Sequence, residues 1–143
     1  MSFILAPPHY WPLALKDQIA TAFREGDPLA IRRALTGLES LDENLRGAPF
    51  RLRILRTCTL EALVPALRLA LSALPCRPEI SLAPLGIIEQ ELADDSRDYD
   101  ATLIYWRLED LAPDLAFADF SPESAAGASQ GLFGRVESTL ALA

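Results

Sequence analysis

The opening third of the chain carries hydrophobic residues at the spacing of an amphipathic helix. The pattern predicts that this helix begins near Pro12 and ends at Gly26, because proline is favoured in the first turn and glycine just past the last. Its buried face is expected to comprise Leu15, Ile19, Ala22 and Phe23.

A second helix is predicted to follow at once. Asp27 and Pro28 form an N-cap and first-turn pair, in which the Asp side chain accepts a hydrogen bond from a backbone amide that the helix leaves free. The expected buried stripe comprises Ile31, Leu35, Leu38 and Leu41. Gly47 and Pro49 then interrupt the helical pattern, so we expect a two-helix lead-in over residues 1–48 and a second domain over 49–143.

Beyond residue 48, predicted strands alternate with predicted helices. The strands are expected within residues 50–55, 77–85 and 101–106, and the helices within 59–74, 85–96 and 128–143. The first strand alternates apolar residues with arginines, whereas the uninterrupted apolar run at 101–106 is typical of a central strand covered on both faces. This order predicts an α/β fold: a three-layer, flavodoxin- or SGNH-like parallel sheet with helices on both faces, after a two-helix N-terminal segment.

Prolines leave two details of this scheme open. The helix at 59–74 is expected to use Thr59 as N-cap and to bury Leu60, Leu63, Val64, Leu67, Leu71 and Leu74. Pro65 lies past its first turn and predicts either a kink or a later regular start. Pro78 and Pro84 are expected to confine the second strand to the residues between them.

Charge and composition exclude several classes of function. A net charge of −7 and a pI near 4.6 argue against binding to nucleic acid or to an anionic membrane surface. Neither a membrane-spanning apolar run nor a signal-peptide pattern is found, so a cytoplasmic location is expected. Cys58 and Cys76 are expected to be reduced thiols, and with a single histidine they predict no metal site and no cofactor.

Candidate site residues are sought where the predicted parallel strands end, because ligands of such sheets bind at the carboxyl edge. The weak catalytic candidates there are Thr57, Cys58 and Thr59, and the strand-end loop candidates are Arg107, Glu109 and Asp110. Cys58 is either a thiol activated at a helix N-terminus or a small packing residue. The cluster of Arg51, Arg53 and Arg56 either lines the solvent side of an edge strand or forms a surface for a phosphate or a partner.

Asp98, Asp100 and Thr102 have the D-x-D-x-T spacing of the nucleophile motif of haloacid-dehalogenase-type phosphatases. In that motif the first Asp follows a buried strand, whereas here the apolar run comes after the aspartates. We therefore interpret the two aspartates as a turn that leads into a strand.

Residues 50–113 resemble the N-terminal SGNH-hydrolase-like domain of FkbH-like proteins of polyketide biosynthesis, which belong to the haloacid-dehalogenase superfamily. The matched residues are Gln90, Glu91, Ser96, Tyr99, Leu103, Ile104, Glu109, Asp110 and Leu111. The resemblance implies a role in loading a glyceryl unit onto an acyl carrier protein. The chain lacks the G-D-S serine and the C-terminal histidine of an SGNH hydrolase, and it is expected to contain no phosphatase domain and to lack the last strand.

Three functions are compatible with this sequence. The leading hypothesis is a catalytically degenerate accessory module of an FkbH-like protein, with an acyl carrier protein or a polyketide synthase module as partner. The second is a small acyl- or phospho-transferring enzyme domain, which would need Cys58 or the acidic residues. The third is a structural domain that forms homo-oligomers through an open sheet edge.

Overall fold

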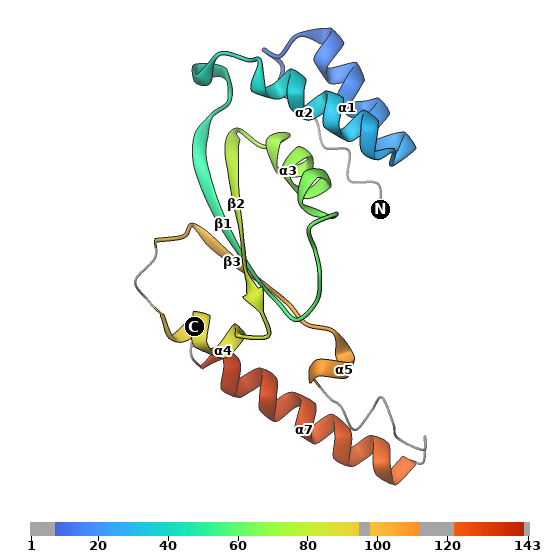
Figure 1. Cartoon of the computed structure of the whole chain (residues 1–143), viewed down its shortest axis with the longest axis vertical. Coiled ribbons are helices and arrows are strands. Elements are labelled where there is room, and N and C mark those ends of the chain that lie inside the picture. The colour runs from blue at the N-terminus through green and yellow to red at the C-terminus, as the bar shows by residue number, and fades with distance from the viewer. Residues whose placement is uncertain (1–7, 95–97, 112–121, 142–143) are drawn as a thin grey trace. The chain divides into compact units, whose positions relative to one another are not determined.

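The structure is a computed structural model of the 143-residue chain, and it describes residues 8–94, 98–111 and 122–141 (Figure 1). Its elements are α1 (Leu13–Glu25), α2 (Pro28–Glu39), η1 (Glu43–Leu45), β1 (Ala48–Arg56), α3 (Val64–Ser72), β2 (Cys76–Leu85), α4 (Ile88–Ala93), β3 (Ala101–Tyr105), α5 (Leu108–Leu111) and α7 (Pro122–Leu140). Two helices precede an alternation of strands and helices, so the predicted α/β class is confirmed.

The three strands form one parallel sheet in the order β2-β1-β3. At the carboxyl ends, the Gly86 amide donates a hydrogen bond to the Arg56 carbonyl at 3.1 Å, and the Thr57 amide donates to the Tyr105 carbonyl at 3.2 Å. At the amino ends of β1 and β2, Gly47 lies against the backbone of Pro75 and Cys76. In a parallel sheet the amino ends of neighbouring strands lie at one edge and the carboxyl ends at the other, as these contacts show. Consecutive parallel strands need crossover connections, which here contain helices.

The strand order corrects two predictions. β1 is the central strand, so the interpretation of its arginines as the solvent face of an edge strand is wrong. β3 is an edge strand, and its side chains at Leu103 and Tyr105 are exposed, so residues 101–106 are not a central strand covered on both faces. β2 is the other edge and runs through both Pro78 and Pro84. An edge strand tolerates proline because one side of its backbone needs no ladder partner.

Contacts divide the chain into two compact units. Unit 1 comprises Met1–Leu52 and Leu60–Ile80, and unit 2 comprises Arg53–Thr59 and Ser81–Ala143. Strands β1 and β2 therefore each contribute residues to both units. The predicted domain limits, 1–48 and 49–143, stay a prediction.

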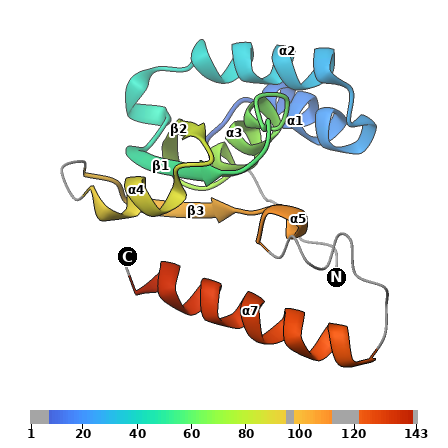
Figure 2. The ribbon, with the colours of Figure 1, turned by 60° about the horizontal axis from the view of Figure 1, so that its bottom comes forward.

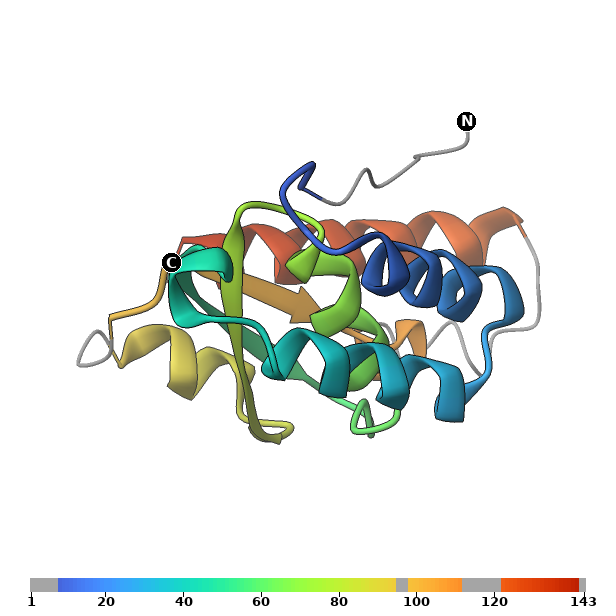
Figure 3. The ribbon, with the colours of Figure 1, turned by 90° about the horizontal axis from the view of Figure 1, so that it is seen from above.

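Unit 1 is built around its helices, with α2 in contact with both α1 and α3 (Figure 3). Its core comprises Trp11, Leu15, Ile19, Ala22, Ala34, Leu38 and Leu69. The predicted helix limits are confirmed: Gly26 ends α1 in a left-handed conformation with φ 63°, and the Asp27 side chain accepts a hydrogen bond from the Ala30 amide at 3.0 Å. Phe23, expected on the buried face, is 43% exposed, whereas Ile31 and Leu35 pack partly against the core.

Pro65 delays the start of α3. Regular helix begins at Val64, so Pro65 lies in the first turn. Backbone amides of the first turn have no carbonyl partner within the helix, so the missing amide hydrogen of proline costs no hydrogen bond there. Thr59 is therefore not the N-cap. The buried face also differs from the predicted one, because Leu69 is fully buried while Leu63 and Leu74 are exposed.

Unit 2 has a smaller core of Leu55, Ala83, Ile88 and Leu92, against which Ile104 and Trp106 pack. Ile88 and Leu92 lie four residues apart on α4, as predicted. Figure 2 shows the elements of unit 2 that follow one another along the chain, α4, β3, α5 and α7. The predicted exit loop begins instead with helix α5, and the last helix begins earlier than residue 128, at Pro122. Ser96 and the rest of the exit loop at 112–121 lie outside the described residues.

No helix within the described ranges combines the length and the apolar character needed to cross a membrane.

Candidate functional site

The structure brings together two of the predicted strand-end segments in unit 2. The Arg107 amide donates a hydrogen bond to the Thr57 hydroxyl oxygen at 3.0 Å. The Arg107 guanidinium binds the Asp110 carboxylate through two hydrogen bonds of 2.8 and 3.0 Å. Residues after β1 and after β3 thus meet at the carboxyl edge of the sheet, as the parallel arrangement predicts.

These charges satisfy one another. Hydrogen bonds from the Arg107 guanidinium and the Thr57 hydroxyl lower the pKa of Asp110, and the same Asp110 carboxylate raises the pKa of Arg107. Arg135 on α7 donates to the Asp110 carbonyl at 2.9 Å and forms an ion pair with Glu89 at 3.7 Å. The cluster therefore joins α5, α7 and α4 by polar contacts at an exposed surface.

Cys58 does not lie at a helix terminus. It is half-buried in the segment after β1, and α3 begins only at Val64, so the positive end of that helix does not adjoin the thiol. A catalytic role for Thr57, Cys58 or Thr59 stays a prediction.

Asp98 and Asp100 precede β3, which begins at Ala101. The motif thus lies at the amino end of the strand, opposite to the arrangement that a phosphatase nucleophile needs. The Thr102 hydroxyl accepts a hydrogen bond from Arg53 Nε at 3.3 Å. No cluster of three potential metal-ligating side chains exists among the residues that the structure describes.

Two of the three β1 arginines, Arg53 and Arg56, are engaged within unit 2. Arg56 is 7% exposed, and its Nε donates to the Ala83 carbonyl at 3.1 Å. Arg53 donates from Nη1 to the Glu91 carbonyl at 2.7 Å, and its guanidinium lies 4.9 Å from the centre of the Tyr99 ring. The partner-binding role of Arg51, Arg53 and Arg56 stays a prediction.

Unit 1 contains a cavity of about 390 Å³ that the sequence did not predict. Its volume falls within the range of small-molecule sites, about 300–1,000 Å³. The apolar lining residues are Trp11, Leu35, Leu38, Pro78 and Ile80, and the polar ones are Glu39, Arg46, Arg68, Ser72, Cys76, Arg77 and Glu79. We call this cavity the arginine pocket, because three arginines line it.

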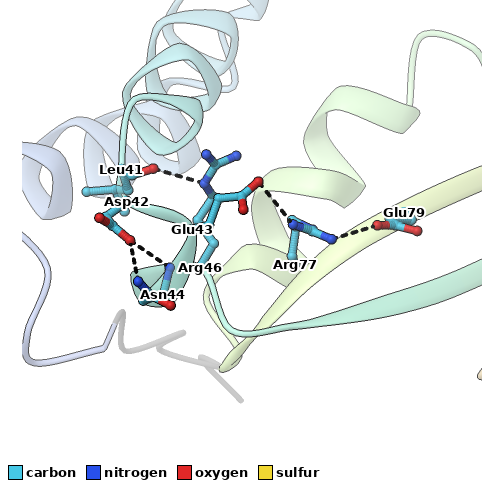
Figure 4. Close-up of polar contacts among 7 residues, drawn as sticks. All are labelled: Leu41, Asp42, Glu43, Asn44, Arg46, Arg77 and Glu79. Atoms are coloured by element: carbon cyan, nitrogen blue, oxygen red, sulfur yellow. Dashed lines mark hydrogen bonds and ion pairs between the residues drawn. The ribbon is translucent and has the colours of Figure 1, made fainter.

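The pocket arginines differ in how far they are already bound. Arg77 pairs with Glu79 at 3.2 Å and with Glu43 at 3.8 Å (Figure 4). Arg46 donates from Nε to the Leu41 carbonyl at 3.0 Å, the contact drawn for it in Figure 4. The turn before Arg46 is held by Asp42, whose carboxylate accepts hydrogen bonds from the Asn44 backbone and side chain at 2.9 Å.

Arg68 on α3 is the least satisfied of the three. Its Nε is buried and has no hydrogen-bond partner within the described part of the chain. A buried donor without a partner destabilises a protein by about 1–3 kcal/mol, and more when the group is charged. Arg68 also lines the cavity, so a ligand bound there that accepts a hydrogen bond from its guanidinium would satisfy a charged group that the described residues leave short of a partner.

Trp11 and Cys76 complete the chemistry of the pocket. Trp11 is 4% exposed, and its indole Nε1 donates to the Leu45 carbonyl at 3.1 Å, which fixes the ring as an apolar wall. Burial raises the pKa of the Cys76 thiol, so the thiol stays protonated near neutral pH and adds no negative charge. The pocket can therefore bind an anion that also carries apolar surface.

A local sequence pattern gives little sign of this site. The three arginines come from different elements: Arg46 follows η1, Arg68 lies on α3 and Arg77 lies on β2. No sequence motif connects them. Comparisons of the chain with protein-family models, curated proteins and solved structures find no match. The resemblance to FkbH-like proteins stays a prediction.

Proposed function

We propose that this chain is a binding module rather than an enzyme, and that the arginine pocket of unit 1 is its ligand site. The observation that carries the proposal is Arg68, which lines a cavity of about 390 Å³ and whose buried Nε has no partner among the described residues. The energetic penalty of that atom is removed when a ligand accepts its hydrogen bond.

The contrast between the two candidate sites supports this proposal. At the carboxyl edge of the sheet, Arg107 and Asp110 form a two-hydrogen-bond ion pair at an exposed surface, and Arg135 binds the same segment. A general acid, a base or a nucleophile needs a group that is available to the substrate. In the arginine pocket, Arg46 and Arg68 retain donors that no described residue uses.

A screen of small molecules tests the proposal. ¹⁵N-labelled protein is titrated with a panel of carboxylates, phosphate esters, amines and neutral alcohols, and amide shifts are mapped onto the structure. We expect the shifts to gather around Trp11, Arg68 and Cys76. Shifts gathered around Thr57 and Arg107, or none from any class of compound, would refute the arginine pocket as the ligand site.

An accessory role beside an FkbH-like protein in the cytoplasm is a second candidate, with an acyl carrier protein as partner. The distribution of charge favours unit 1 as the contact surface. Unit 1 holds eight basic and eight acidic residues, whereas unit 2 holds five basic and twelve acidic ones. An acidic carrier protein is therefore repelled less by unit 1 than by unit 2.

Titration of the labelled chain with an acyl carrier protein tests the second candidate separately. Shifts at the exposed arginines Arg32 and Arg33 of α2, weakened by salt, are expected if the carrier binds through unit 1. Unchanged spectra at high carrier concentration would remove carrier recognition and leave the small-molecule site untouched.

A further inference from the structure

We propose that the ligand of the arginine pocket is an apolar monocarboxylate, a small acid with one negative charge and an aliphatic or aromatic body. This inference rests on the function proposed above and adds the chemical class of the ligand. Three properties of the pocket lead to it: its charge, its apolar lining and its size.

The charge of the pocket matches one negative group. Three arginines and two glutamates line it, which gives a formal charge of +1. Arg77 is neutralised by Glu79 and Glu43, so the donors left for a ligand belong to Arg46 and Arg68. A carboxylate accepts such donors in short, charge-assisted hydrogen bonds. The carboxylate of Glu39 repels any anion, but it repels a doubly charged phosphate about twice as strongly as a monocarboxylate at the same distance.

The apolar lining calls for a hydrophobic body on the same ligand. Trp11, Leu38 and Ile80 line the pocket together with Leu35 and Pro78. Each buried methylene of a ligand gains about 0.8 kcal/mol on leaving water. A bare inorganic anion would leave this apolar surface uncovered and would gain nothing from it.

The size of the pocket sets an upper limit on the ligand. At about 30 Å³ for each non-hydrogen atom, a volume near 390 Å³ accommodates roughly a dozen such atoms. Octanoate, with about ten, fits within this limit and serves as the probe. Octylamine, octan-1-ol and octyl phosphate keep the same chain and change only the head group.

Binding of the four probes to the full chain is measured by isothermal titration calorimetry. We expect octanoate to bind at least tenfold more tightly than octan-1-ol, and octylamine to show no binding. Equal affinity for octanoate and the alcohol would overturn the role of the arginines. Tighter binding of octyl phosphate would overturn the assignment to a carboxylate.

Arg68→Met separates a ligand site from a structural role. Methionine keeps an unbranched, flexible side chain but has no charged donor, so octanoate affinity is expected to fall about tenfold or more. The melting temperature of the free protein is expected to stay unchanged or to rise, because a buried donor without a partner is removed. Arg24→Met, an exposed position on α1 outside the pocket, is the matched control and should leave octanoate affinity unchanged. Loss of folding in Arg68→Met, or unaltered octanoate binding, would contradict the proposal.

Alkylation of the two thiols gives a readout that does not depend on a variant. Cys76 lines the pocket and Cys58 does not, so octanoate should slow the reaction of iodoacetamide with Cys76 alone. Equal protection of both thiols, or of neither, would overturn the placement. If octanoate fails while another class of compound shifts the pocket amides, the carboxylate assignment is lost and the binding function stands.

Discussion

Replacing Gly47 by alanine is expected to destabilise unit 1 more than the same change at any other glycine with positive φ. Gly47 has φ 78°, a conformation that L side chains rarely adopt. A Cβ atom there would lie 2.4 Å from the carbonyl oxygen and 2.6 Å from the carbonyl carbon of Pro75, and 2.8 Å from the Cys76 amide nitrogen. All three are backbone atoms, which cannot rotate away as a side chain can.

The size of the effect follows from two contributions. The left-handed conformation costs an alanine about 1–2 kcal/mol relative to glycine. Forcing extra volume into a packed position costs about 1–3 kcal/mol more. The free energy of unfolding should therefore fall by about 2–5 kcal/mol, which corresponds to a drop of roughly 4 °C in melting temperature for each kcal/mol in a chain of this length.

Gly26→Ala is the matched control. Gly26 also has positive φ, 63°, but nothing lies within 4 Å of the position of its Cβ. It should lose only the conformational contribution of about 1–2 kcal/mol. The difference between the two variants thus isolates the contact between the amino ends of β1 and β2.

Urea denaturation followed by the fluorescence of Trp11, in a Trp106→Phe background, measures the effect in unit 1. The chain has two tryptophans, so this background leaves Trp11 as the sole reporter. Because Cys76 lines the arginine pocket, the Gly47→Ala variant should also bind octanoate more weakly than Gly26→Ala does. Equal losses of stability in the two glycine variants would refute the close approach of β1 to β2 described here.

Two further predictions concern the ends of α2 and α5. Asp27→Ala removes the N-cap hydrogen bond to the Ala30 amide, so the free energy of unfolding should fall by about 1 kcal/mol in thermal denaturation, whereas Asp27→Asn should lose far less. In a ¹³C NMR titration, Asp110 should protonate below the usual range of an aspartate, because Arg107 and Thr57 lower its pKa. Since its folded-state pKa is depressed, its contribution to stability is present above the unfolded-state value of about 3.9 and is lost as the pH falls through the folded-state pKa. Arg107→Gln should return that pKa toward its usual value, and an unchanged titration would show that the ion pair does not form.

Features set by neighbouring residues could be predicted from the sequence alone. The cap at Asp27, the end of the first helix at Gly26 and the pair Ile88 and Leu92 were all predicted and are all present. Each depends on hydrogen bonds or side-chain spacing within one or two helical turns. The parallel sheet followed from the alternation of strands and helices, because parallel strands require crossover connections.

The places of the strands in the sheet were decided by tertiary structure. The apolar run at β3 predicted a central strand, yet β1 is central and β3 lies at an edge. Hydrophobicity indicates that a strand is buried but does not specify its neighbours. The prolines of β2 are likewise compatible with its full length only because that strand is an edge.

The sequence by itself determined the two N-terminal helices and the alternation of strands and helices after them, because those preferences arise from contacts between close neighbours along the chain. Only the tertiary structure brought Arg46, Arg68 and Arg77 to one cavity and left the Arg68 Nε buried with no partner in the described part of the chain. Whether a charged group is paired or available depends on side chains from distant segments, and those neighbours are fixed only when the helices and strands of unit 1 pack together.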